Sequence, residues 1–284
     1  MPGWGSCREC YTGVMKEVQI VKSDGTHEPF APGKLLASLE RAGAAPAVAA
    51  EILAEVEKEL FSGISTQEIY SRAFARLHEH RHAVAARYSL KRAVLEFGPS
   101  GFPFESFIAE LYRAEGFDAK VDQIIRGKCV EHEVDVVITK GGEVQYAEAK
   151  FHNAAGFKTD LKTVLYVKAR VDDIGRGRGL VVTNTKFTSK AVQYSQCAGL
   201  ELLSWDYPQQ GNLHDRIDKA GLYPVTALTT LSNHEKTALL SERIVLCKGL
   251  PENTDALKRA GVSGPRADQV LEEVGALCVP GVGI

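Results

Sequence analysis

The stretch that decides the fold is His132-Glu-Val-Asp-Val-Val-Ile-Thr-Lys-Gly-Gly-Glu-Val-Gln-Tyr-Ala-Glu-Ala-Lys150. Its first half holds a short β-branched run, Val134 to Ile138, which predicts a buried strand. The two glycines that follow Lys140 predict a tight turn. Val144 to Phe151 then predicts the returning strand, so the stretch as a whole predicts a β-hairpin.

The hairpin carries polar residues at positions where polar residues are costly. Asp135 lies within the apolar run, so its carboxylate must be paired, protonated or bound to a metal. Side chains alternate between the two faces of a strand, so Glu148 and Lys150 are expected on one face. Ala147 and Ala149 are expected on the other face, where they are small enough for a helix to pack closely.

Two carboxylates and an ammonium are therefore expected at one end of the hairpin. Oxygen ligands of this kind suit Mg²⁺, and a cation held by Asp135 and Glu148 could polarise a phosphate and activate water. Lys150 could orient that water and offset charge in the transition state. A structural ion pair on a two-stranded edge remains the alternative, since the spacing alone is not specific.

The flanking sequence adds a specific context. An amphipathic helix is predicted before the hairpin, at Phe104 to Tyr112, and glycine ends it. After the hairpin come a predicted long helix, Asp160 to Asp173, an apolar strand, Leu180 to Thr183, a helix that begins Phe-Thr-Ser-Lys-Ala at Phe187, and a last strand. The long helix is expected to turn these residues inward: Leu161, Val164, Leu165, Ala169 and Ile174.

This order resembles that of the Mrr-like restriction endonucleases of the PD-(D/E)xK nuclease superfamily, over roughly Phe102 to Trp205. The resemblance implies that Asp135 and Glu148 are metal ligands, that Lys150 is the catalytic lysine and that Glu105 joins the site from its helix. The chain departs from the pattern in two places. Val134 stands where the motif has proline, and Glu148 stands where Mrr-like members often have glutamine.

The composition is that of an ordinary globular protein. The chain has 284 residues, of which 25% are charged and 44% hydrophobic, and its net charge is −2. This balance does not by itself predict nucleic-acid binding, which a basic domain would favour. A local basic face is expected just after the hairpin, made by Lys158, Lys162, Lys168, Arg170, Arg176 and Arg178.

Targeting signals are absent from the sequence as given. No stretch is long enough to span a membrane and no signal peptide is recognisable, so we expect a cytoplasmic protein. The six cysteines are scattered except for Cys7 and Cys10, which suggests a reducing compartment. A lone Cys-x-x-Cys is too small a set for a zinc site, and residues 1–15 are expected to be a flexible leader.

The N-terminal part predicts a small, mostly helical unit with a β-hairpin. Val18 to Lys22 alternates as a strand, and Glu28 to Phe30 is a second extended piece. Amphipathic helices are predicted at Lys34 to Ala42, Val48 to Phe61, after the capping sequence Ser65-Thr66-Gln67-Glu68, and at Ala83 to Phe97.

This unit resembles the ATP-cone, a regulatory nucleotide-binding domain. The resemblance is carried by Val21-Lys22-Ser23-Asp24-Gly25, Glu28-Pro29-Phe30, Lys34-Leu35, Ile64 to Ile69 and Ala86-Arg87-Tyr88. It implies binding of ATP or dATP, with Lys22, Glu28 and Lys34 in contact with the nucleotide. Arg87 and Lys91, one turn apart, are plausible further phosphate contacts. A domain that kept the fold and lost the ligand is the alternative.

The fold class predicted from these parts is α/β and multidomain. A leader (1–15), an ATP-cone (16–98), an endonuclease-like core with a mixed sheet flanked by helices (99–210) and a helical C-terminal region (211–284) follow one another. The hinge is expected at Gly98-Pro99-Ser100-Gly101. Ala260 to Leu271 weakly resembles a helix-hairpin-helix, and a helical packing or dimerisation appendage is the alternative.

Two functions follow from the sequence. The first is a Mg²⁺- or Mn²⁺-dependent DNA endonuclease that ATP or dATP regulates through the ATP-cone. The second is a nucleotide-gated DNA-binding or oligomerisation protein without cleavage activity. In both cases the expected partners are DNA, an adenine nucleotide and further copies of the chain, and no membrane.

Overall fold

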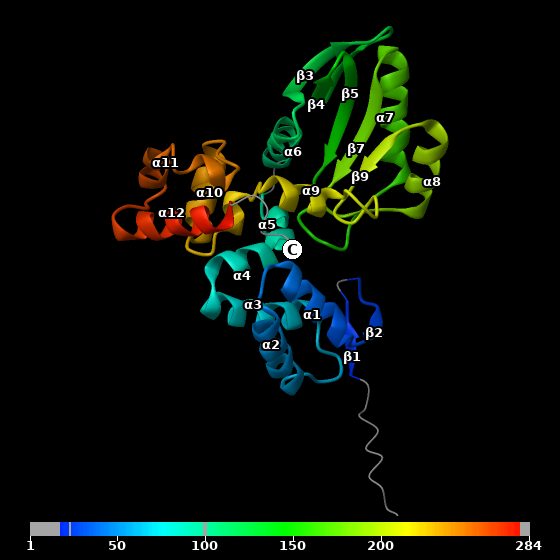
Figure 1. Ribbon diagram of the computed structural model, residues 1–284. Coiled ribbons are helices and arrows are strands. Elements are labelled where there is room, and N and C mark those ends of the chain that lie inside the picture. Colours follow the sequence, from blue (N-terminus) through cyan, green and yellow to red (C-terminus); the bar gives the residue numbers. More distant parts are fainter. Residues whose placement is uncertain (1–17, 23, 99–100, 279–284) are drawn as a thin grey trace, which may run out of the picture.

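The computed structural model describes residues 18–22, 24–98 and 101–278. The Cys7/Cys10 leader and residues 99–100 of the expected hinge lie outside the described residues. Figure 1 shows the N-terminal unit at the bottom, the large sheet at the top and the C-terminal helices at the left. The predicted α/β class is confirmed, with a helical N-terminal region, a mixed sheet flanked by helices and a helical C-terminal region.

The N-terminal unit pairs a small hairpin with five helices. Its elements are β1 (Gln19–Val21), β2 (His27–Pro29), α1 (Pro32–Arg41), α2 (Pro46–Lys58), α3 (Thr66–His80), α4 (His82–Tyr88) and α5 (Leu90–Leu95). The predicted cap of α3 is present, because Ser65 and Glu68 form a reciprocal capping box.

One helix prediction was wrong in this unit. A single helix was expected over Ala83 to Phe97, but the chain forms α4 and α5 with a break at Ser89. The Ser89 hydroxyl donates to the Ala86 carbonyl at 2.9 Å, and such a bond from a hydroxyl to the preceding turn competes with regular helix geometry.

The middle part is built around a five-stranded sheet. Its elements are α6 (Phe102–Ala114), β3 (Asp118–Arg126), β4 (Glu131–Lys140), β5 (Glu143–Lys150), β6 (Lys158–Thr159), α7 (Leu161–Ile174), β7 (Arg178–Thr183), β8 (Lys186–Phe187), α8 (Ser189–Ala198) and β9 (Glu201–Leu203). The strand order is β3-β4-β5-β7-β9, antiparallel from β3 to β5 and parallel from β5 to β9.

Helices cover both faces of this sheet (Figure 1). Helix α6 packs on the face that carries Ile138 and Ala147. Helix α7 packs on the opposite face, where Val164 and Val167 meet Val181. Residues of β5 therefore point alternately to α6 and to α7.

The expected inner face of α7 was partly wrong. Leu165 is 43% exposed, whereas Val164, Val167 and Arg170 are buried. The buried positions are spaced by three residues, which is one stripe of the helix. The inner face was predicted from apolar residues alone, so the prediction included Leu165 and Ala169 and left out Arg170.

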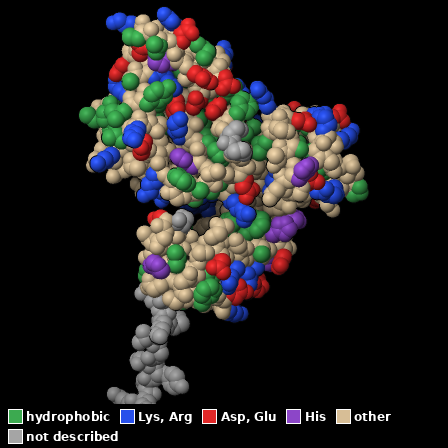
Figure 2. Space-filling view, turned by 180° about the vertical axis from the view of Figure 1, so that it is seen from behind, with side chains coloured by type: hydrophobic (Ala, Val, Ile, Leu, Met, Phe, Trp, Pro, Cys, Tyr) green, Lys and Arg blue, Asp and Glu red, His purple; other side chains and the backbone are tan. Residues whose placement is uncertain are grey.

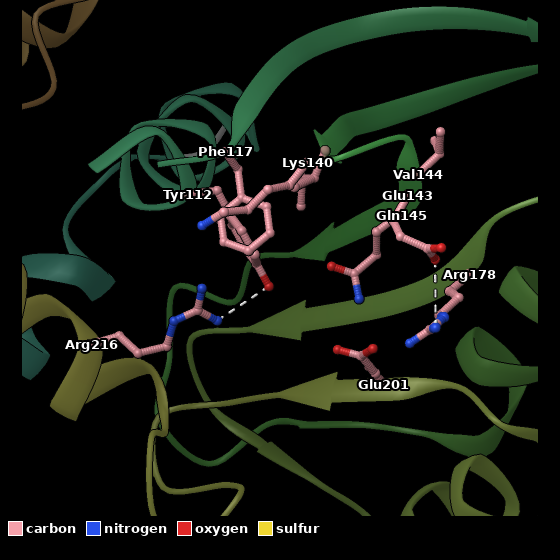
Figure 3. A pocket seen from close by; sticks show the side chains of 10 residues that line it. Tyr112, Phe117, Lys140, Glu143, Val144, Gln145, Arg178, Glu201 and Arg216 are labelled. Atoms are coloured by element: carbon pink, nitrogen blue, oxygen red, sulfur yellow. Dashed lines mark hydrogen bonds and ion pairs between the residues drawn. The ribbon is translucent and has the colours of Figure 1, made fainter. Parts of the chain in front are cut away.

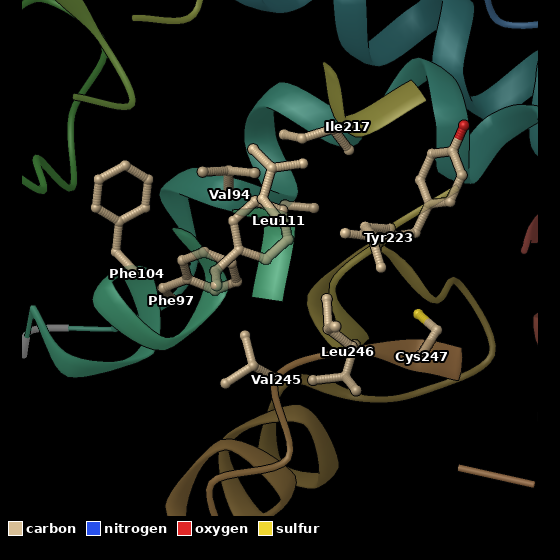
Figure 4. Close-up of a cluster of buried hydrophobic side chains, with 14 of the residues drawn as sticks. Val94, Phe97, Phe104, Leu111, Ile217, Tyr223, Val245, Leu246 and Cys247 are labelled. Atoms are coloured by element: carbon tan, nitrogen blue, oxygen red, sulfur yellow. The ribbon is translucent and has the colours of Figure 1, made fainter. Parts of the chain in front are cut away.

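The C-terminal region is helical and shares a core with the middle part. Its elements are α9 (Leu213–Ala220), α10 (Asn233–Ser241), α11 (Thr254–Arg259) and α12 (Pro265–Leu277), with short 3₁₀ turns η1 (Val225–Ala227) and η2 (Cys247–Gly249). Figure 4 shows Phe97 and Phe104 in one cluster with Ile217 and Val245. The stretch predicted as helix-hairpin-helix-like, Ala260 to Leu271, covers the turn after α11 and the first half of α12. Leu257 and Val270 from these two helices enter the same core.

The N-terminal unit has its own core, which includes Leu39, Ile52 and Leu77. The shared core begins at Ala86, so the end of α4 and all of α5 pack with the middle and C-terminal parts. Figure 2 shows the two bodies joined across a hollowed waist. Within the described residues, no helix has the length and apolar character needed to cross a membrane.

Candidate active site

The β4–β5 hairpin brings the three predicted polar residues together. The Ala149 amide donates to Asp135 Oδ2 at 2.7 Å, which fixes the carboxylate of β4 against β5. Lys150 Nζ lies 2.7 Å from Glu148 Oε1 on the face that α7 covers. The expected alternation is observed, because Ala147 and Ala149 are buried in the core on the α6 side.

Glu148 is almost fully buried and lies between two cations. Its Oε1 pairs with Lys150, and its Oε2 accepts from Arg170 Nη1 at 2.7 Å. Arg170 in turn donates to the Tyr166 hydroxyl at 2.8 Å and lies over the Tyr166 ring. A buried carboxylate with both oxygens paired is held in one orientation.

Sequence reasoning missed Arg170 as a site residue. It was assigned to an exposed basic face, but it is 5% exposed and points into the sheet. Its spacing from Val164 and Val167 was the available signal, because these three positions share one side of α7. Arg178 also leaves the expected face, since it lies at the start of β7 and pairs with Glu143 at 3.5 Å.

Glu105 joins the site from the first turn of α6. Burial raises the pKa of its carboxyl to about 7, and the charge of Asp135 is the next cause, followed by Asp122, Glu133 and Glu148. Burial also raises the pKa of Asp135 to about 6, with the Glu148 charge adding to it. The charges of these carboxyls therefore act on one another, and at Asp135 the nearby Arg170 and Lys150 offset burial and the Glu148 charge only in part.

Asp122 is a further carboxylate at the site that the sequence did not reveal. Its backbone φ is 51°, in the left-handed region that aspartate tolerates better than most residues. The pairing of β3 with β4 is interrupted at this position, which lies between the Val121–Val136 and Gln123–Val134 pairs and thus faces Asp135. The residue pattern of this strand gave no reason to predict a left-handed backbone angle at Asp122.

Lys150 is a cation in this arrangement. Burial lowers its pKa, but the hydrogen bond to Glu148 and the charges of Glu148 and Asp135 outweigh burial, and the net pKa is raised. A protonated ammonium donates hydrogen bonds and offsets negative charge, and it has no lone pair with which to accept a proton.

The donor set fits a hard divalent cation held by two protein carboxylates. Asp135 and Glu148 supply oxygen ligands, and Mg²⁺ commonly uses one or two carboxylates and completes its shell with water and substrate oxygens. In the part of the chain that the structure describes, no three His, Cys, Asp or Glu side chains are grouped at metal-ligand spacing. Binding at Glu148 also requires Lys150 to leave Oε1, because that oxygen is already paired.

A second polar cluster lies on the N-terminal hairpin. Glu28 pairs with Lys22 Nζ at 2.5 Å and with Lys34 Nζ at 3.4 Å. The hydrogen bond from Lys22 is the main reason that the pKa of Glu28 is lowered. The three residues predicted to contact a nucleotide are thus brought together at β1, β2 and the start of α1.

Arg87 and Lys91 are not part of that cluster. Arg87 Nη2 donates to the carbonyls of Ala276 at 3.1 Å and Leu277 at 3.4 Å, at the end of α12. Lys91 Nζ lies 5.8 Å from the centre of the Trp205 ring. Both residues lie near the C-terminal end of α1, whereas Lys34 lies in its first turn.

A separate groove of about 450 Å³ lies at the opposite end of the sheet from Lys150. Figure 3 shows Gln145, Arg178 and Glu201 along its floor, with Arg216 beside the Tyr112 hydroxyl. Arg178 and Glu201 begin β7 and β9, and Gln145 lies near the start of β5. Glu148 and Lys150 lie at the other end of β5. The groove and the carboxylate site are therefore distinct.

Comparisons with known proteins place the three parts of the chain. The ATP cone domain model matches residues 18–94, the restriction endonuclease model Mrr_cat matches 99–207 and the AF1548-like C-terminal model matches 223–278. An uncharacterized protein of Archaeoglobus fulgidus is 34% identical over 170 residues, which are 58% of this chain and 97% of that protein. The chain belongs to the AF1548-like family.

One solved structure agrees with this family assignment. The crystal structure of AF1548, titled a protein of unknown function, is 31% identical and covers 63% of this AF1548-like chain and 98% of its own, with a TM-score of 0.54. The MspJI restriction endonuclease in complex with a 27-mer oligonucleotide is 16% identical, covers 66% of this chain and 39% of its own, and has a TM-score of only 0.35. The predicted fusion of an ATP-cone to an Mrr-like restriction endonuclease domain is confirmed.

Proposed function

We propose that this protein is a metal-dependent DNA endonuclease. The observation that carries the proposal is the grouping of Asp135, Glu148 and Lys150 on one face of the β4–β5 hairpin. Glu105 lies nearby, and burial, followed by the charge of Asp135, raises its pKa to about 7. A structural ion pair would need only Glu148 and a cation. The additional carboxylates, which repel one another, are what a cation site requires.

Asp135 and Glu148 are the residues that would hold Mg²⁺ or Mn²⁺. When bound, the cation polarises the phosphodiester and lowers the pKa of a water molecule. Lys150, released from Glu148, donates to the attacking water or the phosphate oxygens and offsets their growing charge. Glu105 takes up or releases a proton near neutral pH, and Arg170 keeps Glu148 oriented through Oε2.

Exposed aromatic side chains near the site suit a nucleic-acid substrate. Phe157 is 61% exposed and stacks on His152, with the two ring centres 5.8 Å apart. His152 follows Lys150 by two residues. His152 is held by Asn184, which accepts from its amide at 2.9 Å and donates to its carbonyl at 2.7 Å. Exposed aromatic rings on a fixed base can stack against DNA bases or sugars.

The N-terminal cluster is proposed to bind ATP or dATP and to regulate cleavage. Lys22 and Lys34 are available to meet phosphates, and Glu28 to accept from a sugar hydroxyl or to share a magnesium ion. We further propose that the protein works as a homo-oligomer whose size responds to the nucleotide. Light scattering with and without ATP tests this, and an unchanged mass together with an unchanged cleavage rate contradicts it.

Cleavage of plasmid and linear duplex DNA with Mg²⁺ or Mn²⁺ tests the enzyme assignment. Asp135→Asn and Lys150→Ala are expected to reduce the rate by about 100-fold or more, as loss of a transition-state contact usually does. Lys120→Ala is the matched control, because Lys120 is an exposed lysine of the same sheet, paired only with Asp118 at 3.8 Å. Equal cleavage by all three variants would rule out this site, whereas DNA binding without any cleavage would favour the nucleotide-gated binding protein.

A further inference from the structure

A pocket of about 220 Å³ lies where the N-terminal unit meets the rest of the molecule. Several separate parts of the chain line it. The end of α1 and the α4–α5 pair supply Arg41, Arg87 and Lys91, the segment after β9 supplies Trp205, and α9 supplies Asp218. The pocket therefore exists only while these segments are docked together.

Positive charge dominates this junction pocket. Arg41, Arg87 and Lys91 line it, and Asp218 is its one carboxylate among the lining residues. Asp218 is already engaged, since it accepts from the Tyr223 hydroxyl at 3.1 Å and lies 3.2 Å from His214 Nε2. Within the described ranges, neither Arg41 nor Lys91 forms an ion pair with a carboxylate.

Two of the three cations are held in place, whereas Arg41 is exposed. Arg87 is anchored by the Ala276 and Leu277 carbonyls, and Gly43 packs against it so closely that a Cβ there would lie 3.3 Å from Arg87 Nη1. Lys91 is partly buried over the Trp205 ring, and burial lowers its pKa. A partly buried ammonium without a carboxylate partner is costly, and a bound anion would remove that cost.

The size and chemistry of the pocket define its ligand. Guanidinium and ammonium groups together are typical of phosphate sites. The volume is below the range of roughly 300–1,000 Å³ that holds a drug-sized molecule, so only a small group can enter. A phosphate, either free or at the end of a small ester, meets both conditions.

We propose that the junction pocket binds a phosphate group through Arg41, Arg87 and Lys91. This site differs from the Lys22, Glu28 and Lys34 cluster. Arg41 ends α1 and Lys34 lies in its first turn, so about 10 Å of helix separates them at 1.5 Å per residue. The proposal does not depend on nuclease activity.

Calorimetric titration of the full-length protein tests the proposal. The probes are inorganic phosphate and adenosine 5′-monophosphate, without Mg²⁺ and at an ionic strength kept constant with sodium chloride. Saturable binding of either probe is expected, and the arm that binds more tightly tells whether the source is free phosphate or a phosphate ester. Arg41→Met and Lys91→Met are each expected to weaken binding roughly tenfold or more, as loss of a charge-assisted hydrogen bond does.

Two charge-matched controls separate this pocket from other cations. Lys58→Met removes an exposed charge from α2 and is expected to leave phosphate binding intact. Lys34→Met removes a charge from the cluster proposed to bind ATP, so it reports any probe binding at that cluster instead. Arg41 is exposed, so Arg41→Met remains informative if Lys91→Met does not fold. Absence of saturable binding, or loss of binding in Lys34→Met with retention in both junction variants, would overturn the proposal.

Discussion

At the residue scale, the site depends on how Glu148 is held. Its two oxygens are paired with Lys150 and Arg170, and both Glu148 and Arg170 are about 95% buried. Removing one partner of a buried pair leaves a charge that the interior cannot compensate. The orientation of Glu148 should thus depend more on Arg170 than on half-exposed Lys150.

Replacing Arg170 is predicted to destabilise the fold. Arg170→Met should lower the free energy of unfolding by about 3 kcal/mol, because it strands the Glu148 carboxylate. Urea denaturation gives this value directly. Arg176→Met, at the exposed end of the same segment, is the control and should change stability by less than about 0.5 kcal/mol. Equal effects of the two variants would mean that the buried pair contributes nothing.

The raised carboxyl pKa values predict how stability depends on pH without metal. Glu105 has a folded pKa of about 7 against an ordinary 4.5, and Asp135 about 6 against 3.8. The folded state then binds more protons than the unfolded state between these values. Its stability is fully present at about pH 4 and is lost as pH rises through 6 and 7.

Melting temperatures at about pH 5.5 and about pH 8, with and without Mg²⁺, test this account. The metal-free protein should melt lower at the higher pH, and Mg²⁺ should raise the melting temperature more there, because the carboxylates are then charged. Glu105→Gln should flatten the dependence, whereas Glu110→Gln on the same helix should keep it. A metal effect that is equal at both pH values would speak against a cation among these groups.

The sequence identified the residues whose positions follow from strand alternation. Glu148 and Lys150 lie two positions apart in one strand, so their shared face could be deduced. Arg170 and Asp122 could not be found in this way. The first is a buried cation on an otherwise apolar stripe, and the second depends on a backbone angle of the left-handed region.

At the element scale, the C-terminal helix α12 is fixed by one buried carboxylate. Glu273 is 4% exposed and accepts from the backbone amides of Thr229 at 2.8 Å and Thr230 at 3.0 Å. It also accepts from both hydroxyls, at 2.7 and 2.6 Å. These bonds tie α12 to the segment that precedes α10.

The variant Glu273→Gln is predicted to lower the free energy of unfolding by about 2 kcal/mol, since it weakens several bonds to a charged acceptor. Its neighbour offers a matched control, because Glu272 is exposed and Glu272→Gln should have little effect. Chemical denaturation measures both. If the two variants lose the same stability, the four bonds to Glu273 do not hold α12.

Element prediction succeeded where local signals were strong and failed where distant contacts decided. The caps of α3 and α7 are set by Ser65 and Asp160, which begin two of the predicted helices. The break at Ser89 was not predicted, because a single serine within a helical pattern gives no reason to expect it. Helix α5 also packs against η1, where Thr226 donates to the Ala93 carbonyl at 2.7 Å. These two residues are 133 positions apart in the chain, so no local pattern predicts their contact.

At the scale of the whole molecule, two of the three core clusters meet within α4. One core ends at Ala85, and the other runs from Ala86 through the sheet to Leu277. The domain bounds at residues 98 and 210 stay a prediction, and the larger of these two clusters extends across both positions. We therefore expect the sheet and the C-terminal helices to unfold as one unit.

Native-state hydrogen exchange tests this expectation. Amides of α10 and α12 should become exchangeable together with those of β5 and β7, at a free energy distinct from that of α1 to α3. A C-terminal region that opens alone, or together with α1 to α3, would contradict a shared core.

The central claim is that Asp135, Glu148 and Lys150 form a cation-dependent hydrolytic site. A crystal of the full-length protein soaked in Mn²⁺ and measured at the manganese absorption edge tests it most directly. The account predicts an anomalous peak roughly 2.0–2.3 Å from oxygens of both Asp135 and Glu148, with the Lys150 ammonium moved away from Glu148 Oε1. Absence of a peak at the carboxylates, with Lys150 still paired to Glu148, would contradict it.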